Sequence, residues 1–181
     1  MKIRFLLFLS ILLCFLVTSC TENRRVKAMM MDFIDSEIVI PNDLVCIQEG
    51  NLTKIDLDSL KQNKYIIYYD SLDCSSCRVG HLMDIYPLYQ MADTMGFSVL
   101  TIFAPRIRDI DEIKLQLMVS QHPFPVYIDL SREFTIRNRE IPLDSRFHCF
   151  LIDHRGKPLL VGNPLYNEKI LDLLDEILQH R

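Results

Sequence analysis

Residues 65–83, YIIYYDSLDCSSCRVGHLM, join a buried-strand pattern to a pair of cysteines. The first five residues form an unbroken run of β-branched and aromatic side chains, which predicts a strand buried on both faces. Cys74 and Cys77 follow, three positions apart, and stand in front of apolar residues at helical spacing. The stretch predicts a strand, a two-cysteine turn and a helix. The cysteines could serve as a working thiol pair, as part of a metal site or as a structural disulfide.

The rest of the chain predicts strands that alternate with helices, and therefore a sheet with helical cover. The expected strands lie at 97–103, 124–129, 148–153 and 158–162. The expected helices run from Cys77 to Gly96, over 109–121 and over 167–179, with a short candidate at 57–62. Pro87 should kink or interrupt the first of these helices, because proline lacks the N–H that a helix interior needs.

The N-terminus has the pattern of a secretory signal. Two basic residues precede an apolar run over residues 5–17, which is too short for a comfortable membrane span. The tetrapeptide VTSC, residues 17–20, resembles the lipobox of bacterial lipoproteins, in which cleavage leaves a lipid-modified cysteine. The sequence therefore predicts a signal peptide over 1–19 and an acyl (palmitate-type) anchor on Cys20. It also predicts an extracytoplasmic place in the bacterial cell envelope, such as the periplasm.

Removal of residues 1–19 would leave 181 − 19 = 162 residues, enough for one domain with its own core. We expect a tether over 20–31, an N-terminal extension packed on the core over 32–63, and the main domain over 64–181. The mature charge would be 18 − 24 = −6, since two of the twenty Lys and Arg and none of the Asp and Glu lie in the signal. An acidic chain of this kind is not expected to bind nucleic acid.

Three motifs in order resemble the thioredoxin-like family. They are CSSC (74–77), FPVYID (124–129) and FHCFLIDHRGK (147–157). The resemblance is to its membrane-tethered thiol-disulfide oxidoreductases and to its peroxiredoxin-related (AhpC/TSA-like) members. It implies an α/β fold with a central mixed sheet flanked by helices, preceded by the N-terminal extension. It also implies action on disulfides of extracytoplasmic proteins, a membrane thiol donor as a possible partner, and no cofactor.

The chemistry of a helix start explains why the spacing suits a redox pair. At the helix entrance, the Cys74 sulfur would face unpaired backbone N–H groups and the positive end of the helix dipole, which favour a thiolate. Cys77, one turn later, could attack a mixed disulfide on Cys74 and release the substrate. We expect Cys74 to be the nucleophile and Cys77 the resolving thiol.

Phe147 stands where the family places a cis proline beside the thiols. In the family that proline keeps a backbone edge open for substrate and discourages metal from bridging the cysteines. The resemblance therefore implies that Phe147 controls substrate access.

Two alternatives belong to other functional classes. Cys74 and Cys77 with His148, or with His81, could bind copper or zinc, which take thiolate and imidazole ligands. A static disulfide would instead leave a non-enzymatic binding or scaffold protein. Cys46 and Cys149 are expected as small core residues, although they could pair if the N-terminal extension crosses the strand after Phe147. The sequence favours the thiol-disulfide oxidoreductase.

Overall fold

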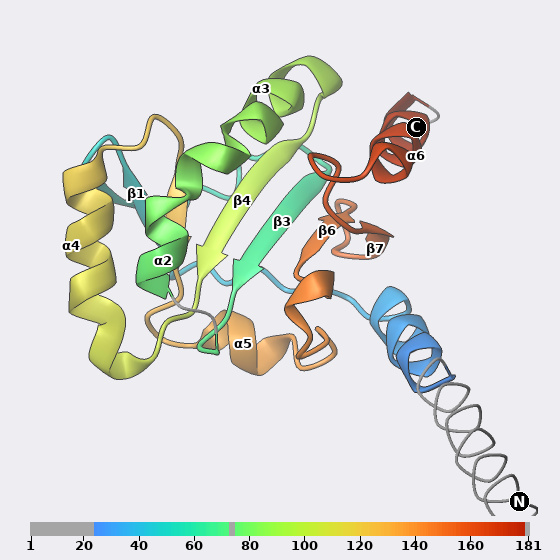
Figure 1. Cartoon of the computed structure of the whole chain (residues 1–181), viewed down its shortest axis with the longest axis horizontal. Helices are drawn as coiled ribbons and strands as arrows, with labels where there is room; N and C mark the ends of the chain where they lie inside the picture. The colour runs from blue at the N-terminus through green and yellow to red at the C-terminus, as the bar shows by residue number, and fades with distance from the viewer. Residues whose placement is uncertain (1–23, 73–74, 180–181) are drawn as a thin grey trace, which may run out of the picture.

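A computed structural model describes residues 24–72 and 75–179 of the 181-residue chain. It contains one mixed sheet with helices on both faces (Figure 1). The strands are β1 (Val45–Gln48), β2 (Asn51–Lys54), β3 (Lys64–Tyr69), β4 (Ser98–Phe103), β5 (Val126–Ile128), β6 (Cys149–Ile152) and β7 (Pro158–Val161).

The helices follow the strands in the predicted alternation. Residues 24–34 are helical. The later helices are α2 (Ser75–Gly80), α3 (Tyr86–Met95), α4 (Ile110–Ser120), α5 (Glu133–Arg137) and α6 (Glu168–Gln179). Short 3-10 turns are η1 (Leu82–Ile85), η2 (Ile107–Asp109) and η3 (Ser145–Phe147).

The sheet has the order β2-β1-β5-β4-β3-β6-β7. β3, β4 and β5 are parallel neighbours, whereas β6 joins β3 and β1 joins β5 in antiparallel fashion. The connections from β3 to β4 and from β4 to β5 both move toward the same edge of the sheet. Because such crossovers are right-handed, the helices α2, α3 and α4 lie on the same face.

Strand β3 supplies side chains to two cores. Tyr65 and Ile67 belong to the core under α2, α3, α4 and α6, while Ile66 and Tyr68 belong to the core on the other face. Successive residues of a strand point to opposite faces, so a strand covered on both sides needs apolar residues at every position. This is the physical origin of the unbroken apolar run.

The helix predicted from Cys77 to Gly96 is interrupted before Pro87, as expected. Helix α2 ends at Gly80, η1 follows, and Pro87 lies in the first turn of α3. The N–H groups in the first turn of a helix have no acceptor within the helix, so proline, which lacks this group, is tolerated there. Gly96 ends α3 with φ 79°, the left-handed conformation that glycine adopts without strain.

The short helix predicted for residues 57–62 is wrong. These residues form turns and bends, in which Ser59 Oγ donates to Asp56 O at 2.8 Å. Side chains of this kind compete with the helix for backbone hydrogen bonds, and the segment is too short to overcome the cost of helix nucleation. Helix α5 and the helical residues 24–34 were not predicted.

Residues 32–63, expected as an extension packed on the core, contribute β1 and β2 to the sheet. Phe33 is fully buried against Phe150 of β6, with ring centroids 5.0 Å apart. Ile38 N donates to Gly156 O at 2.8 Å, and a Cβ on Gly156 would lie 2.2 Å from Ile38 O. The glycine therefore permits this close approach, which joins the N-terminal segment to the β6–β7 turn.

The possible pairing of Cys46 with Cys149 does not occur, and neither cysteine forms a disulfide. β1 lies four strand positions from β6, or about 19 Å at ~4.8 Å per strand, far beyond the reach of a disulfide. Cys46 is buried, and burial raises the pKa of its thiol, in keeping with a neutral core residue. Within residues 24–72 and 75–179, no helix is long and apolar enough to cross a membrane.

Candidate functional site

The cysteine motif follows the carboxyl end of the central strand β3. A turn over residues 70–72 leads from β3 toward α2, and Asp70 Oδ1 accepts the N–H of Leu72 at 2.8 Å. Loops at the carboxyl ends of parallel strands commonly carry functional groups on a rigid support. Cys74 and Cys20, the predicted nucleophile and lipid anchor, both lie outside the described residues.

Cys77 lies on α2, and it is exposed and disulfide-bonded. Since neither Cys46 nor Cys149 forms a disulfide, the partner of Cys77 lies outside the described residues. The sulfur chemistry at this position is therefore open to solvent and not enclosed in the core.

Helix α4 brings a carboxylate to the motif. Ser76, between the two motif cysteines, donates from Oγ to Glu112 Oε1 at 3.0 Å, and Gln116 Nε2 donates to the same oxygen at 3.0 Å. Arg78 on α2 lies over the ring of Tyr69, with its guanidinium carbon 5.4 Å from the centroid. Glu112 was not among the predicted site residues, because no local sequence pattern indicates which helix packs against α2.

Phe147 ends η3, the turn that leads into β6. Its side chain is half-buried, and the guanidinium carbon of Arg146 lies 5.7 Å from the centre of its ring. The turn is capped by Asp144, whose carboxylate accepts from Arg146 N at 3.0 Å; its hydrogen bonds to Arg146 lower the pKa of Asp144 to about 2. Tyr68 N donates to His148 O at 2.9 Å, which fixes the start of β6 against β3.

His148 is buried and only partly hydrogen-bonded. Nε2 lies 2.7 Å from Pro142 O, and because a carbonyl only accepts, Nε2 must carry the proton. Nδ1 then presents a lone pair, and it has no partner among the described residues. The imidazole also packs against the ring of Tyr68, with centroids 5.1 Å apart.

The metal alternative finds no support in the described residues. Among them, no three His, Cys, Asp or Glu side chains gather in a group that could hold an ion. His81 is exposed, and its Nδ1 lies 3.3 Å from Asp84 Oδ2 on the same turn. The Nε2 atom of His148 is already bonded to Pro142 O. The set of Cys74, Cys77 and His148 includes a residue outside the described part.

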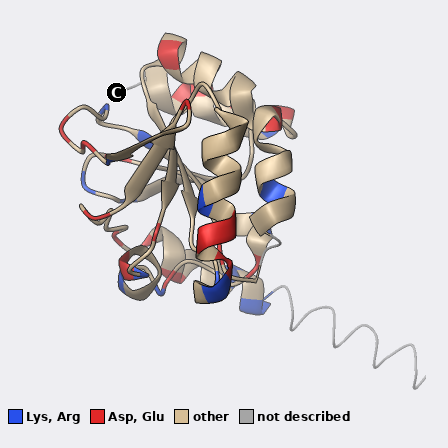
Figure 2. Cartoon of the chain, turned by 90° about the vertical axis from the view of Figure 1, so that its left-hand side faces the viewer, with Lys and Arg blue, Asp and Glu red and all other residues tan. Residues whose placement is uncertain are grey.

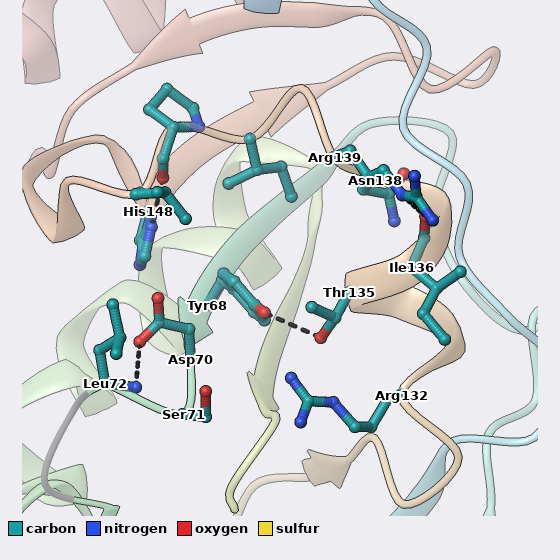
Figure 3. Close-up of a pocket in the computed structure, with 13 residues that line it drawn as sticks. Tyr68, Asp70, Ser71, Leu72, Arg132, Thr135, Ile136, Asn138, Arg139 and His148 are labelled. Atoms are coloured by element: carbon teal, nitrogen blue, oxygen red, sulfur yellow. Dashed lines mark hydrogen bonds between the residues drawn. The ribbon is translucent and has the colours of Figure 1, made fainter.

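A cavity of about 580 Å³ opens beside the loop that precedes the cysteines (Figure 3). It is lined by Tyr68, Asp70, Ser71, Leu72, Arg132, Thr135, Ile136, Asn138, Arg139, Ile141, Pro142, Leu143 and His148. Tyr68 and Thr135 hydroxyls lie 3.0 Å apart, and Thr135 Oγ1 donates to Asp129 Oδ2 at 3.3 Å. Burial raises the pKa of Tyr68 and also that of Asp129. No local sequence pattern indicates this cavity, because its walls come from segments that are far apart in the sequence.

Charges on the side that carries α2 and α4 are mixed. Figure 2 shows acidic and basic stretches close together at the lower end of this side. Arg106, for example, pairs with Asp109 at 2.7 Å.

Comparison with known proteins identifies the fold and not the function. No family model and no curated protein matches the chain. Among solved structures, a protein described as the thiol:disulfide interchange protein DsbE from Chlorobium tepidum is 18% identical, covers 80% of this chain and 98% of its own, and has a TM-score of 0.51. AhpC from Mycobacterium bovis is 14% identical over 81% of this chain and 92% of its own, with a TM-score of 0.54. AhpC from Enterococcus faecalis is 11% identical over 82% and 93%, with a TM-score of 0.53.

The fold is therefore thioredoxin-like, as predicted. It is a mixed sheet flanked by helices, with the cysteine-bearing helix placed after a central parallel strand.

Proposed function

We propose that this protein is an extracytoplasmic thiol-disulfide oxidoreductase that acts on protein disulfides through Cys74 and Cys77. The observation that carries the proposal is Cys77 itself, an exposed and disulfide-bonded cysteine on the helix that follows the central strand. The thioredoxin-like neighbours described as DsbE and AhpC lend support at the level of fold.

In the reducing direction, the Cys74 thiolate attacks one sulfur of the client disulfide. A mixed disulfide forms, and the other client sulfur leaves as a thiolate that takes up a proton. The Cys77 thiolate then attacks Cys74 Sγ, which releases the second client thiol and leaves the enzyme as a disulfide. Two electrons pass to the client, and a thiol donor at the membrane restores the dithiol. With an oxidising partner the same steps run in reverse.

The test uses protein that starts after Cys20. Wild type should reduce a peptide disulfide, and Cys77→Ser should accumulate clients on Cys74 as mixed disulfides that non-reducing electrophoresis resolves. The double variant Cys74→Ser/Cys77→Ser is the control and should trap nothing. Trapping by the double variant, or none by Cys77→Ser, would contradict the proposal. Stoichiometric binding of copper or zinc without trapping would favour the metal class.

The location is part of the same proposal. We infer that Cys20 carries an acyl anchor after removal of residues 1–19. In cells, Cys20→Ser should then move the protein from the detergent phase to the aqueous phase. Unchanged partitioning would refute the anchor.

A further inference from the structure

The cavity of Figure 3 lies next to the cysteine motif but contains no described cysteine. Leu72, on its wall, is two residues before Cys74. The opposite wall comes from α5 and from the segment between α5 and η3. A molecule that occupies the cavity would therefore lie beside the loop that leads into the cysteine motif.

Three large apolar side chains surround the cavity and are exposed to solvent. Leu72 is 78% exposed, Leu143 81% and Ile136 50%. Single exposed apolar residues are ordinary, but a group around a cavity is typical of a binding surface. Covering them removes apolar area from water, which favours a partner that is itself partly apolar.

The cavity is lined by more basic than acidic side chains. Its lining has two arginines, Arg132 and Arg139, and one acidic residue, Asp70. Among the described residues, no carboxylate pairs with Arg132. The adjacent Glu133 pairs instead with Arg137, at 2.6 Å. In Figure 3 the guanidinium of Arg132 points toward Ser71. A guanidinium in this position suits a carboxylate, which it can bind through two parallel N–H donors.

The backbone of Arg132 supports a role for its side chain. Its φ is 63°, in the left-handed region, where a residue other than glycine is strained. Glycine would adopt this conformation without strain. Glu49 and Gln121 also have positive φ, but of the three only Arg132 lines the cavity. Strained residues of this kind cluster at binding and catalytic sites.

His148 adds an unpaired acceptor to the wall. It is 3% exposed and lines the cavity, and its Nδ1 has no partner among the described residues. A buried acceptor without a donor is costly, and unsatisfied groups in native proteins often belong to sites that a ligand completes. An N–H group, such as those of an extended peptide backbone, is the donor that would satisfy it.

We propose that this cavity binds an extended segment of the client protein beside its target disulfide, and that an acidic side chain of the segment pairs with Arg132. The inference rests on the proposed oxidoreductase function and adds the class of client: disulfides flanked by acidic and apolar residues. The exposed apolar side chains around the cavity contact the segment, and the Arg132 guanidinium favours an acidic side chain in it. The motif cysteines react with the adjacent disulfide.

The experiment compares synthetic peptides that each contain one intrachain disulfide. Each peptide of one set carries a glutamate either directly before or directly after its first cysteine. Its partner in the matched set carries glutamine at the same position. Wild type should reduce the best glutamate peptide with a kcat/KM at least about fivefold above its glutamine partner, as expected for a charge-assisted contact. The ratio should fall as salt rises.

Arg132→Gln should bring the ratio close to one, and Arg132→Lys should restore part of it. Arg137→Gln is the matched control, because Arg137 is the last residue of α5, the helix whose N-cap is Arg132, and does not line the cavity. This variant should keep the wild-type ratio. Circular dichroism and thermal melts establish that each variant is folded. An equal rate on both sets in wild type, or an unchanged ratio in Arg132→Gln, would overturn the inference.

A binding measurement separates this inference from the proposed function. Serine versions of the same peptides, labelled with a fluorophore, report binding without redox chemistry. If no peptide is reduced by wild type, the oxidoreductase proposal fails. If wild type binds the serine version of the glutamate peptide and Arg132→Gln does not, the result would still support binding in the cavity. If wild type does not bind this peptide, the inference is overturned.

Discussion

Glu112 is a carboxylate that contacts the motif directly. It accepts the hydroxyl of Ser76 at 3.0 Å, so its negative charge lies beside the segment between the two cysteines. A nearby anion disfavours a thiolate, and thus disfavours the reduced form of a thiol pair. This contact links α4, a distant part of the chain, to the redox chemistry proposed for α2.

We expect Glu112→Gln to raise the reduction potential of the pair by roughly 10–30 mV, because removal of the anion favours the dithiol state. Equilibration in glutathione buffers measures this potential. Asp111→Asn, on the same helical turn, is the matched control and should change little. Ser76→Ala removes the hydrogen bond but keeps the charge. If Ser76→Ala shifts the potential as much as Glu112→Gln, the hydrogen bond and not the charge is responsible.

Phe147 is half-buried at the turn before β6. The sequence resemblance implies that thioredoxin-like proteins have a cis proline at the corresponding position. We expect Phe147→Pro to raise insulin reduction several-fold, because proline removes the aromatic ring and a donor N–H and allows a cis peptide at modest cost. Phe147→Ala separates the two effects, since it removes only the ring. Strong insulin reduction by wild type, with no gain in either variant, would show that Phe147 does not limit access.

At the scale of elements, α5 depends on a buried carboxylate. Asp129 follows β5 and is 1% exposed, and its Oδ2 accepts from both the backbone N–H and the hydroxyl of Thr135 on α5. Its Oδ1 has no hydrogen-bond partner among the described residues. Burial therefore outweighs these bonds and raises the pKa of Asp129. The same contacts position α5, which supplies Thr135 and Ile136 to the cavity.

The raised pKa predicts how stability changes with pH. The folded state favours the protonated carboxyl more than the unfolded state does, so this contribution is complete below about pH 3.9 and is lost as pH rises through the folded pKa. Asp129→Asn removes the titration. We expect the stability of wild type relative to Asp129→Asn to decrease between pH 4 and pH 7, measured by urea unfolding. A difference that is constant, or that rises with pH, would show that the carboxylate is better stabilised than its burial implies.

At the scale of the whole molecule, the N-terminal segment is part of the main core. Phe33 is fully buried in the cluster that also contains Leu44, Phe134 and Phe150. Residues from the first and last thirds of the chain therefore share one core. The segment before β1 should contribute to the stability of the whole fold.

We expect Phe33→Ala to lower the free energy of unfolding by about 3–5 kcal/mol, because it leaves a large cavity in a closed core. Met31→Ala, two positions earlier and exposed, should change it by less than about 0.5 kcal/mol. Chemical denaturation of the two variants measures both values. A loss below about 1 kcal/mol in Phe33→Ala would mean that the segment detaches without disturbing the core.

The sequence by itself determined the order and type of the central elements, because strand and helix patterns are local. The apolar run of β3, the interruption before Pro87 and the amphipathic α6 could each be read from a short window. Short elements such as α5 were missed, since tertiary contacts, here Asp129 with Thr135, stabilise them more than their own propensity does.

Only the tertiary structure decided which distant residues meet. The position of β1 beside β5 separates Cys46 from Cys149, and the packing of α4 on α2 brings Glu112 to Ser76. The cavity likewise joins Leu72, Arg132 and His148 from three separate segments. The physical reason is that strand order and helix docking depend on the burial of surfaces far apart in sequence, which no local periodicity records.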